Sequence, residues 1–208
     1  MMHPAHQIRI VIVFLSVVCL SNCSDSQPKL SPLLEDAVIL GFGDSLTFGT
    51  GADSKTESYP AILEKLSGRT VINSGIPGEI TQHGLERLVD VLDQYSPDLV
   101  ILCHGGNDLI RRLDKQQLKS NLVKMISLIQ SVGAEVVLIG VPNFSLTLGV
   151  PELYAELAES HHIPIDIETL PALVRSPSLK SDSVHPNAEG YRQLAQNIHS
   201  LLQTSGAL

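Results

Sequence analysis

The chain has few of the residues on which several classes of protein depend. Its 208 residues include no tryptophan, and 14 lysines and arginines stand against 22 aspartates and glutamates, a formal net charge of −8. Nucleic acids are bound through clustered basic side chains that neutralise phosphates. No basic stripe is present, so nucleic acid is excluded as the main partner.

Cysteine is also scarce. The three cysteines are Cys19, Cys23 and Cys103, and no pair has the CxxC spacing of a redox or zinc site. Cys103 ends an apolar run, which favours a small buried core residue. The sequence therefore indicates neither a disulfide framework nor a metal site, and no metal or organic cofactor is implied.

No apolar run near the start is long enough to span a bilayer. The segment from Ile10 to Leu20 is interrupted only by Ser16 and follows Arg9; its 11 residues are about half of the roughly 20 that a spanning helix requires. A short apolar run after a weakly positive start is typical of a signal peptide. We therefore expect residues 1–22 to direct export.

The end of this segment, Leu20-Ser21-Asn22-Cys23, resembles the lipobox of bacterial lipoproteins. The resemblance implies lipidation of Cys23, although Asn22 stands where a small residue such as Gly or Ala is usual. An ordinary cleaved signal with a coincidental cysteine is the alternative. With Ser24 in place of an aspartate, the resemblance implies a periplasmic protein anchored in the outer membrane. Residues 24–32 are polar and contain proline, which predicts a tether over residues 23–34 before one domain over residues 35–208.

Five short apolar runs alternate with helical patterns in the rest of the chain. Continuous runs without alternation are typical of parallel strands covered on both faces. The expected strands are Ala37–Phe42, Thr70–Asn73, Asp98–Cys103, Glu135–Gly140 and Ile163–Ile167. Between and after them, helices are expected over Tyr59–Leu66, Leu85–Leu92, Leu118–Ile129, Pro151–Ser160 and Tyr191–Leu202. Asp114 with Gln117 is expected to cap the helix over Leu118–Ile129, and Asn187 the helix over Tyr191–Leu202. This order predicts an α/β fold, a three-layer doubly wound, flavodoxin-like sandwich around a five-stranded parallel sheet.

Polar clusters follow four of these runs, where a doubly wound sheet binds its ligands. They contain Gly43-Asp44-Ser45-Leu46, Asn73-Ser74-Gly75, Gly105-Gly106-Asn107-Asp108 and Asp182-Ser183-Val184-His185-Pro186. In this order the four blocks resemble those of the SGNH (GDSL) hydrolase family, over roughly Ala37 to Leu202. Ser183 departs from the family's usual glycine, which matters only if the backbone there requires one.

The resemblance implies a serine hydrolase with catalytic Ser45, Asp182 and His185. The residue types agree with this chemistry, because a serine hydroxyl needs a base within reach and the base needs a carboxylate to fix its tautomer. The Ser45 N–H, the Gly75 N–H and the Asn107 amide are the expected donors to an oxyanion. Each residue also has a plainer interpretation as a helix cap or turn residue. Asp44, Asp108, His161 and His162 are expected to be structural, His104 to lie in a loop or pocket wall, and Asn73 and Asn143 to be possible cleft residues.

The run from Gly43 to Ala52 and the following Ser58-Tyr59-Pro60 resemble the bacterial thioesterase, lysophospholipase and arylesterase branch of the family. This implies a small-molecule or lipid ester, or a thioester, as substrate. Three alternatives remain open: a carbohydrate O-acetylesterase, a flavodoxin-like binding module with Gly41–Gly51 as a phosphate loop, and an inactive lipoprotein. The absence of tryptophan disfavours flavin binding. The sequence does not indicate an oligomeric state.

Overall fold

The computed structural model describes residues 27–144 and 148–208 and contains a five-stranded, fully parallel sheet. The strands are β1 (Val38–Gly43), β2 (Thr70–Gly75), β3 (Leu99–Cys103), β4 (Glu135–Ile139) and β5 (Ile165–Asp166), in the order β2-β1-β3-β4-β5. The expected doubly wound α/β fold is confirmed. The expected export signal and Cys23 lie outside the described residues.

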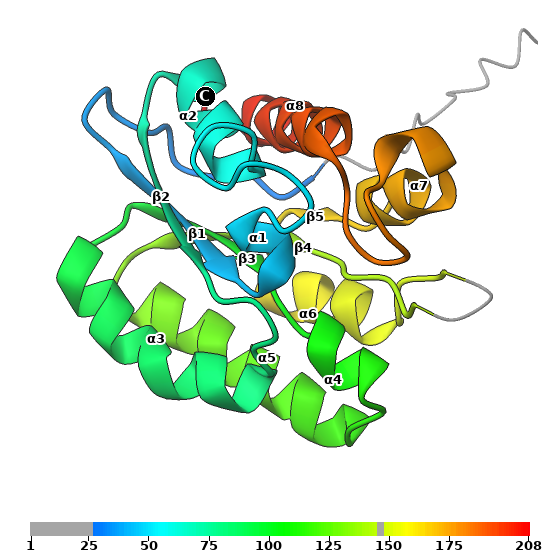
Figure 1. Ribbon diagram of the computed structural model, residues 1–208. Helices are drawn as coiled ribbons and strands as arrows, with labels where there is room; N and C mark the ends of the chain where they lie inside the picture. The colour runs from blue at the N-terminus through cyan, green and yellow to red at the C-terminus, as the bar shows by residue number, and fades with distance from the viewer. Residues whose placement is uncertain (1–26, 145–147) are drawn as a thin grey trace, which may run out of the picture.

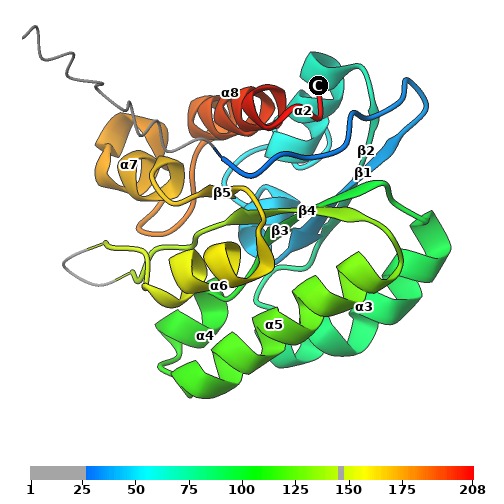
Figure 2. The ribbon, with the colours of Figure 1, turned by 180° about the vertical axis from the view of Figure 1, so that it is seen from behind.

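Helices cover both faces of the sheet, as Figures 1 and 2 show. One layer contains α2 (Tyr59–Ser67), α7 (Thr169–Arg175) and α8 (Ala188–Ser205), and the other contains α3 (Thr81–Tyr95), α5 (Lys115–Ser131) and α6 (Leu153–His161). Three short elements complete the fold: α1 (Ser45–Phe48), α4 (Gly106–Ile110) and the 3₁₀ helix η1 (Pro177–Leu179). Every residue of β3 is buried, which explains its unbroken apolar run. None of the helices within the described ranges has both the length and the hydropathy needed to cross a bilayer.

Two of the expected helix caps are present. The Asp114 carboxylate accepts the N–H groups of Gln116 and Gln117 at the start of α5, and Asn187 accepts that of Gly190 at the start of α8. The Gln117 side chain donates to Asn121 instead of returning to Asp114, so the reciprocal half of a capping box is not formed.

The last strand is shorter than the sequence predicts. The run over Ile163–Ile167 forms a strand only at Ile165–Asp166, on the edge of the sheet. Pro164 has no N–H to donate to a ladder, and the N–H of Ile163 instead closes the end of α6 by donating to Ala158. The short helices α4 and α7 were not predicted, because neither is long enough to show a periodic pattern.

The first described residues, 27–36, cross the end of α8 without helix or strand. The N–H of Leu30 donates to the Ser205 carbonyl and that of Leu33 to the Ala207 carbonyl, each at 2.9 Å. Residues 27–34, the described part of the expected tether, are thus held against the domain. The boundary at residue 35 stays a prediction.

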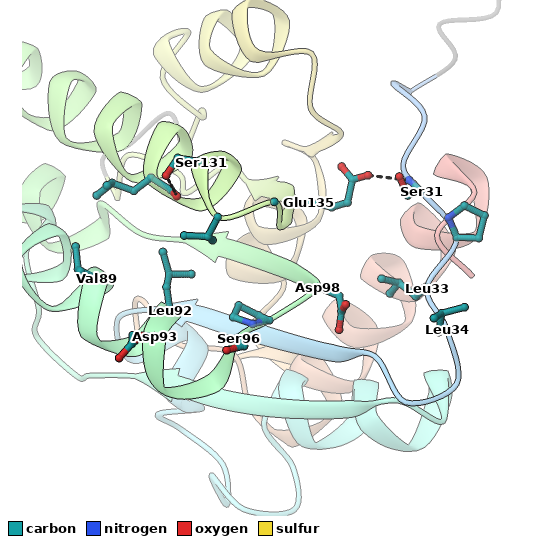
Figure 3. Close-up of a pocket in the computed structure, with 15 residues that line it drawn as sticks. Ser31, Leu33, Leu34, Val89, Leu92, Asp93, Ser96, Asp98, Ser131 and Glu135 are labelled. Carbon is teal, nitrogen blue, oxygen red and sulfur yellow. Dashed lines mark hydrogen bonds between the residues drawn. The ribbon is translucent and has the colours of Figure 1, made fainter.

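A hollow of about 700 Å³ lies between these first residues and the ends of α3 and α5, at the edge where β3 and β4 begin (Figure 3). Leu33, Leu34 and Val89 contribute apolar surface to it. The carboxylates of Asp98 and Glu135 on its wall accept the backbone N–H groups of Val38 and Ser31. Those two acidic side chains therefore brace the backbone at the end of the sheet opposite the expected catalytic residues.

Candidate active site

Ser45 stands at the junction of β1 and α1. Asp44 is the N-cap of α1, and its carboxylate accepts the Leu46 N–H at 3.1 Å. Just before it, Gly43 passes so close to β3 that a Cβ there would lie 1.9 Å from the Cys103 carbonyl oxygen. Glycine is therefore required at position 43 for the chain to bring Ser45 to the carboxyl edge of the sheet.

Ser45, His185 and Asp182 form a continuous hydrogen-bonded chain. His185 Nε2 lies 3.0 Å from Ser45 Oγ, and His185 Nδ1 lies 2.8 Å from Asp182 Oδ2. The other oxygen of Asp182 accepts the N–H groups of Val184 and His185 at 2.7 and 2.8 Å. The residue types and their order match a nucleophile, a base and the carboxylate that orients it.

The Asp182 carboxylate stays ionised over a wide pH range. Partial burial raises its pKa, but hydrogen bonds from the His185 ring and from the His185 and Val184 N–H groups outweigh this and bring the pKa to about 2. An ionised acceptor fixes the proton of His185 on Nδ1 and leaves Nε2 free to accept from Ser45.

The loop that carries Asp182 and His185 is held by its own backbone. The Ser181 N–H donates to the His185 carbonyl at 2.9 Å, and Lys180 pairs with Pro186 in an antiparallel bridge. Ser183 is not among the described non-glycine residues with positive φ. Its replacement of the family's usual glycine therefore adds no backbone strain.

The three expected oxyanion donors lie at the same edge but differ in their present partners. The Gly75 N–H donates to Asn73 Oδ1 at 3.0 Å. The Asn107 amide donates to Asp44 Oδ2 at 3.2 Å and to the Glu79 carbonyl at 3.0 Å. The Ser45 N–H makes none of the turn, loop or cap hydrogen bonds found among the described residues.

A small hollow opens beside Ser45. Its volume is about 240 Å³, and residues Asp44–Leu46, Thr50, Pro77, Gly78, Gly106, Asn107, Ile110, Phe144, Val184 and His185 line it. A second hollow of about 590 Å³ continues from it and shares Ile110, Phe144 and Val184. The hollow beside Ser45 therefore has a largely apolar wall, whereas Arg112, Lys115 and Asn143 also line the second hollow.

Of the other polar residues named from the sequence, Asp108, His161 and His162 lie at helix ends, and Asn143 lines a hollow. Asp108 accepts the N–H and the hydroxyl of Thr81 at the start of α3, as expected for a structural carboxylate. His161 ends α6 and His162 caps it. Asn143 lines the second hollow.

His104 lies in the loop between β3 and α4, as expected, but it does not line the hollow beside Ser45, because it is fully buried and bonds to Glu79. Asn73 is not part of the hollow beside Ser45, because its amide points toward the Phe48 carbonyl. Glu79 and Arg87 were not predicted as part of the site; they bond to each other beneath it and lie eight residues apart. An acid and a base at that spacing have no recognisable pattern in one sequence.

Comparison with known proteins supports one assignment. Residues 42–193 match the GDSL-like lipase/acylhydrolase family. An arylesterase of Vibrio mimicus is 34% identical over 202 residues, which cover 90% of this chain and 96% of that enzyme. The thioesterase 1/protease 1/lysophospholipase L1 of Escherichia coli K12 is 29% identical over 177 residues, covering 79% of this chain and 83% of that enzyme.

A solved structure agrees with the sequence relatives. The structure of AlinE4, described as a SGNH-hydrolase family esterase, superposes with a TM-score of 0.63 at 32% identity and covers 83% of this chain and 98% of that one. The fold, the family match and the relatives all support the same family. The chain belongs to the GDSL-like lipase/acylhydrolase family and is a serine hydrolase that acts on ester bonds.

Proposed function

We propose that Ser45 is the nucleophile, His185 the general base and Asp182 the residue that orients the base. The observation that carries this proposal is the 3.0 Å contact between His185 Nε2 and Ser45 Oγ, which joins side chains 140 residues apart. A surface turn that merely capped α8 would not need to meet Ser45. The ionised Asp182 on the far side of the ring supports the same roles.

In the proposed reaction, Ser45 Oγ attacks the ester carbonyl carbon while its proton passes to His185 Nε2. The tetrahedral intermediate then expels the alcohol or thiol, which takes that proton from His185, and an acyl-serine remains. Water attacks the acyl-serine with His185 again accepting a proton, and the acid leaves with Ser45 regenerated. Asp182 stabilises the imidazolium formed in both halves of the cycle.

The oxyanion of each intermediate is proposed to accept from the Ser45 N–H, the Gly75 N–H and the Asn107 amide. The Ser45 N–H begins α1, where an anion is also favoured by the helix dipole. To bind the oxyanion, the Gly75 N–H would release Asn73 Oδ1. One hydrogen of the Asn107 amide would likewise release Asp44 Oδ2. The Gly75 N–H would exchange a neutral amide oxygen for a charged acceptor and Asn107 would exchange one carboxylate oxygen for the oxyanion, so each donor keeps a partner.

We propose that the substrates are carboxylic esters or thioesters with an apolar acyl chain or an aryl group, including lysophospholipids. The apolar side chains of Ile110, Phe144 and Val184, shared by the two hollows, would contact the acyl chain. The V. mimicus relative is named an arylesterase and the E. coli relative a thioesterase and lysophospholipase, which supports this class. A carbohydrate O-acetylesterase is the alternative, and it would not need the second hollow.

Hydrolysis of p-nitrophenyl esters from acetate to palmitate tests the proposed substrate class. We expect kcat/KM to rise from acetate to medium chains, because each buried methylene contributes roughly 0.8 kcal/mol, or about fourfold. Activity on acetate alone would support the O-acetylesterase. No activity on any ester would contradict the proposal and favour a binding module.

We also propose that the protein is exported and anchored through Cys23. The apolar run from Ile10 to Leu20 and the lipobox-like residues before Cys23 support this. In cells that make the full chain, Cys23→Ser should move the protein from the membrane fraction to the soluble fraction, with Cys103→Ser as the matched control. Unchanged membrane fractionation of Cys23→Ser would contradict the anchor.

A further inference from the structure

An ion pair between the buried Glu79 and the partly buried Arg87 lies beneath the proposed oxyanion donors and has no part in the mechanism described above. Glu79, in the turn between β2 and α3, is 7% exposed. Its two carboxylate oxygens accept Nε and Nη2 of Arg87, on α3, both at 2.7 Å. Two parallel hydrogen bonds of this kind fix the guanidinium and the carboxylate in one plane.

The Arg87 guanidinium also bonds the ends of two neighbouring strands. Its Nη2 donates to the Gly43 carbonyl at the end of β1 at 3.3 Å and to the Ser74 carbonyl in β2 at 3.0 Å. Its Nη1 donates to the Ser74 hydroxyl at 2.8 Å, and its Cζ lies 4.0 Å from the centre of the Phe42 ring. One side chain thus joins the backbone two residues before Ser45 to the backbone one residue before Gly75.

Glu79 bonds the third segment of the site. Its carbonyl accepts the Asn107 amide at 3.0 Å, and its carboxylate lies 3.1 Å from His104 Nε2. The Gly105 N–H donates to His104 Nδ1, so the ring hydrogen is on Nε2 and His104 donates to Glu79. Gly84 leaves the space for this ring, because a Cβ there would lie 2.3 Å from Nε2.

Hydrogen bonding keeps the Glu79 carboxylate charged in this buried position. Burial raises the pKa of Glu79, but hydrogen bonds from His104 and Arg87 outweigh it and hold the pKa below its ordinary value. A buried ion pair contributes little net stability compared with apolar residues of the same shape. Its geometry can nevertheless fix the relative positions of the groups that it joins.

We propose that Arg87 and Glu79 are positioning residues that set the spacing of the three oxyanion donors. The Ser45 N–H, the Gly75 N–H and the Asn107 amide lie on three separate segments, and the pair hydrogen-bonds all three segments. The inference rests on the proposed function, because it assumes that those donors hold an oxyanion. Donors that move by a fraction of an ångström lose stabilisation in the transition state and much less in substrate binding.

The test is ester hydrolysis by the double variant Arg87→Gln/Glu79→Gln, which removes both charges together and leaves neither buried ion unpaired. We expect kcat to fall about 30-fold while KM changes by less than about threefold. Arg87→Lys retains the charge but cannot reach both strands and the carboxylate, so it should show the same fall. Leu88→Ala, on the same helix with a fully buried side chain, is the control: it should lower Tm and leave kcat unchanged.

A fall in kcat of less than about tenfold in folded double variant overturns the inference, as does an equal fall in Leu88→Ala. If the double variant does not fold, the same criterion applies to Arg87→Lys. A failure of the proposed function is recognised separately, because wild-type protein would then lack ester turnover or Ser45→Ala would retain it.

Discussion

Gly51 packs against Pro186 so closely that it can carry no side chain. A Cβ at Gly51 would lie 2.5 Å from the carbonyl oxygen of Pro186, and 2.2 Å from Ser181 Oγ. Ser181 and Pro186 flank Asp182 and His185, so a side chain at position 51 would press on the loop that carries these two residues. Gly51 also has a φ of 103°, in the left-handed region that favours glycine.

Gly51→Ala should therefore displace His185 from Ser45. We expect kcat/KM to fall by about 10- to 100-fold, because a shift of about 1 Å costs up to about 100-fold in rate. The matched control is Gly68→Ala, where φ is 66° and no atom lies within 4 Å of the added Cβ. Both variants should lose Tm through backbone strain, and only Gly51→Ala should lose activity. Equal activity of the two variants would contradict the packing role of Gly51.

Asp182→Asn should lower kcat by about 100-fold or more, because an amide can hold His185 in the wrong tautomer. KM should change little, since the substrate does not contact Asp182 in the proposed mechanism. Steady-state kinetics near neutral pH would measure the effect. Turnover within about threefold of wild type would contradict the orienting role.

Asp182→Asn should also change how the stability of the folded protein depends on pH. The pKa of Asp182 is lowered from 3.8 to about 2 in the folded protein. The stability that it contributes is therefore present above pH 3.8 and lost as the pH falls toward 2. We expect the Tm difference between wild type and Asp182→Asn to shrink between about pH 5 and about pH 2. A difference that grows with acidification would contradict the hydrogen bonds assigned to the carboxylate.

Ile110→Ser should reduce the preference for longer acyl chains. Ile110 lines both hollows beside Ser45 and is 47% exposed. We expect the ratio of kcat/KM for octanoate over acetate to fall by about threefold or more, since part of the apolar contact is lost. Val132→Ser, at the opposite end of the sheet and 59% exposed, should leave the ratio unchanged. An unchanged ratio in Ile110→Ser would mean that the acyl chain lies elsewhere.

The sequence predicted the sheet from strong local rules, whereas the contact between Ser45 and His185 was predicted from the resemblance of four sequence blocks to the SGNH hydrolase family. Buried parallel strands require unbroken apolar runs, and the carboxyl ends of such strands meet at one edge. The Asp182–His185 spacing lets one carboxylate bond the following backbone and the ring within a single turn. These contacts depend on few other residues.

The contacts around Glu79, Arg87 and His104 could not be predicted in this way. Glu79 lies in an irregular turn, Arg87 on an amphipathic helix and His104 after a strand, and only tertiary packing brings them together. Nor does the sequence show that Gly75 and Asn107 already donate to Asn73 and Asp44, since those partners depend on side-chain rotamers.

The most direct test of the central claim is p-nitrophenyl hexanoate hydrolysis by Ser45→Ala and wild type, compared at equal concentration of folded protein. The Ser45 hydroxyl is the group that His185 Nε2 contacts at 3.0 Å, and no acyl-serine can form without it. We predict that kcat/KM falls by about 1,000-fold or more while Tm changes little. Turnover by folded Ser45→Ala within about tenfold of wild type would contradict the assignment of Ser45 as the nucleophile.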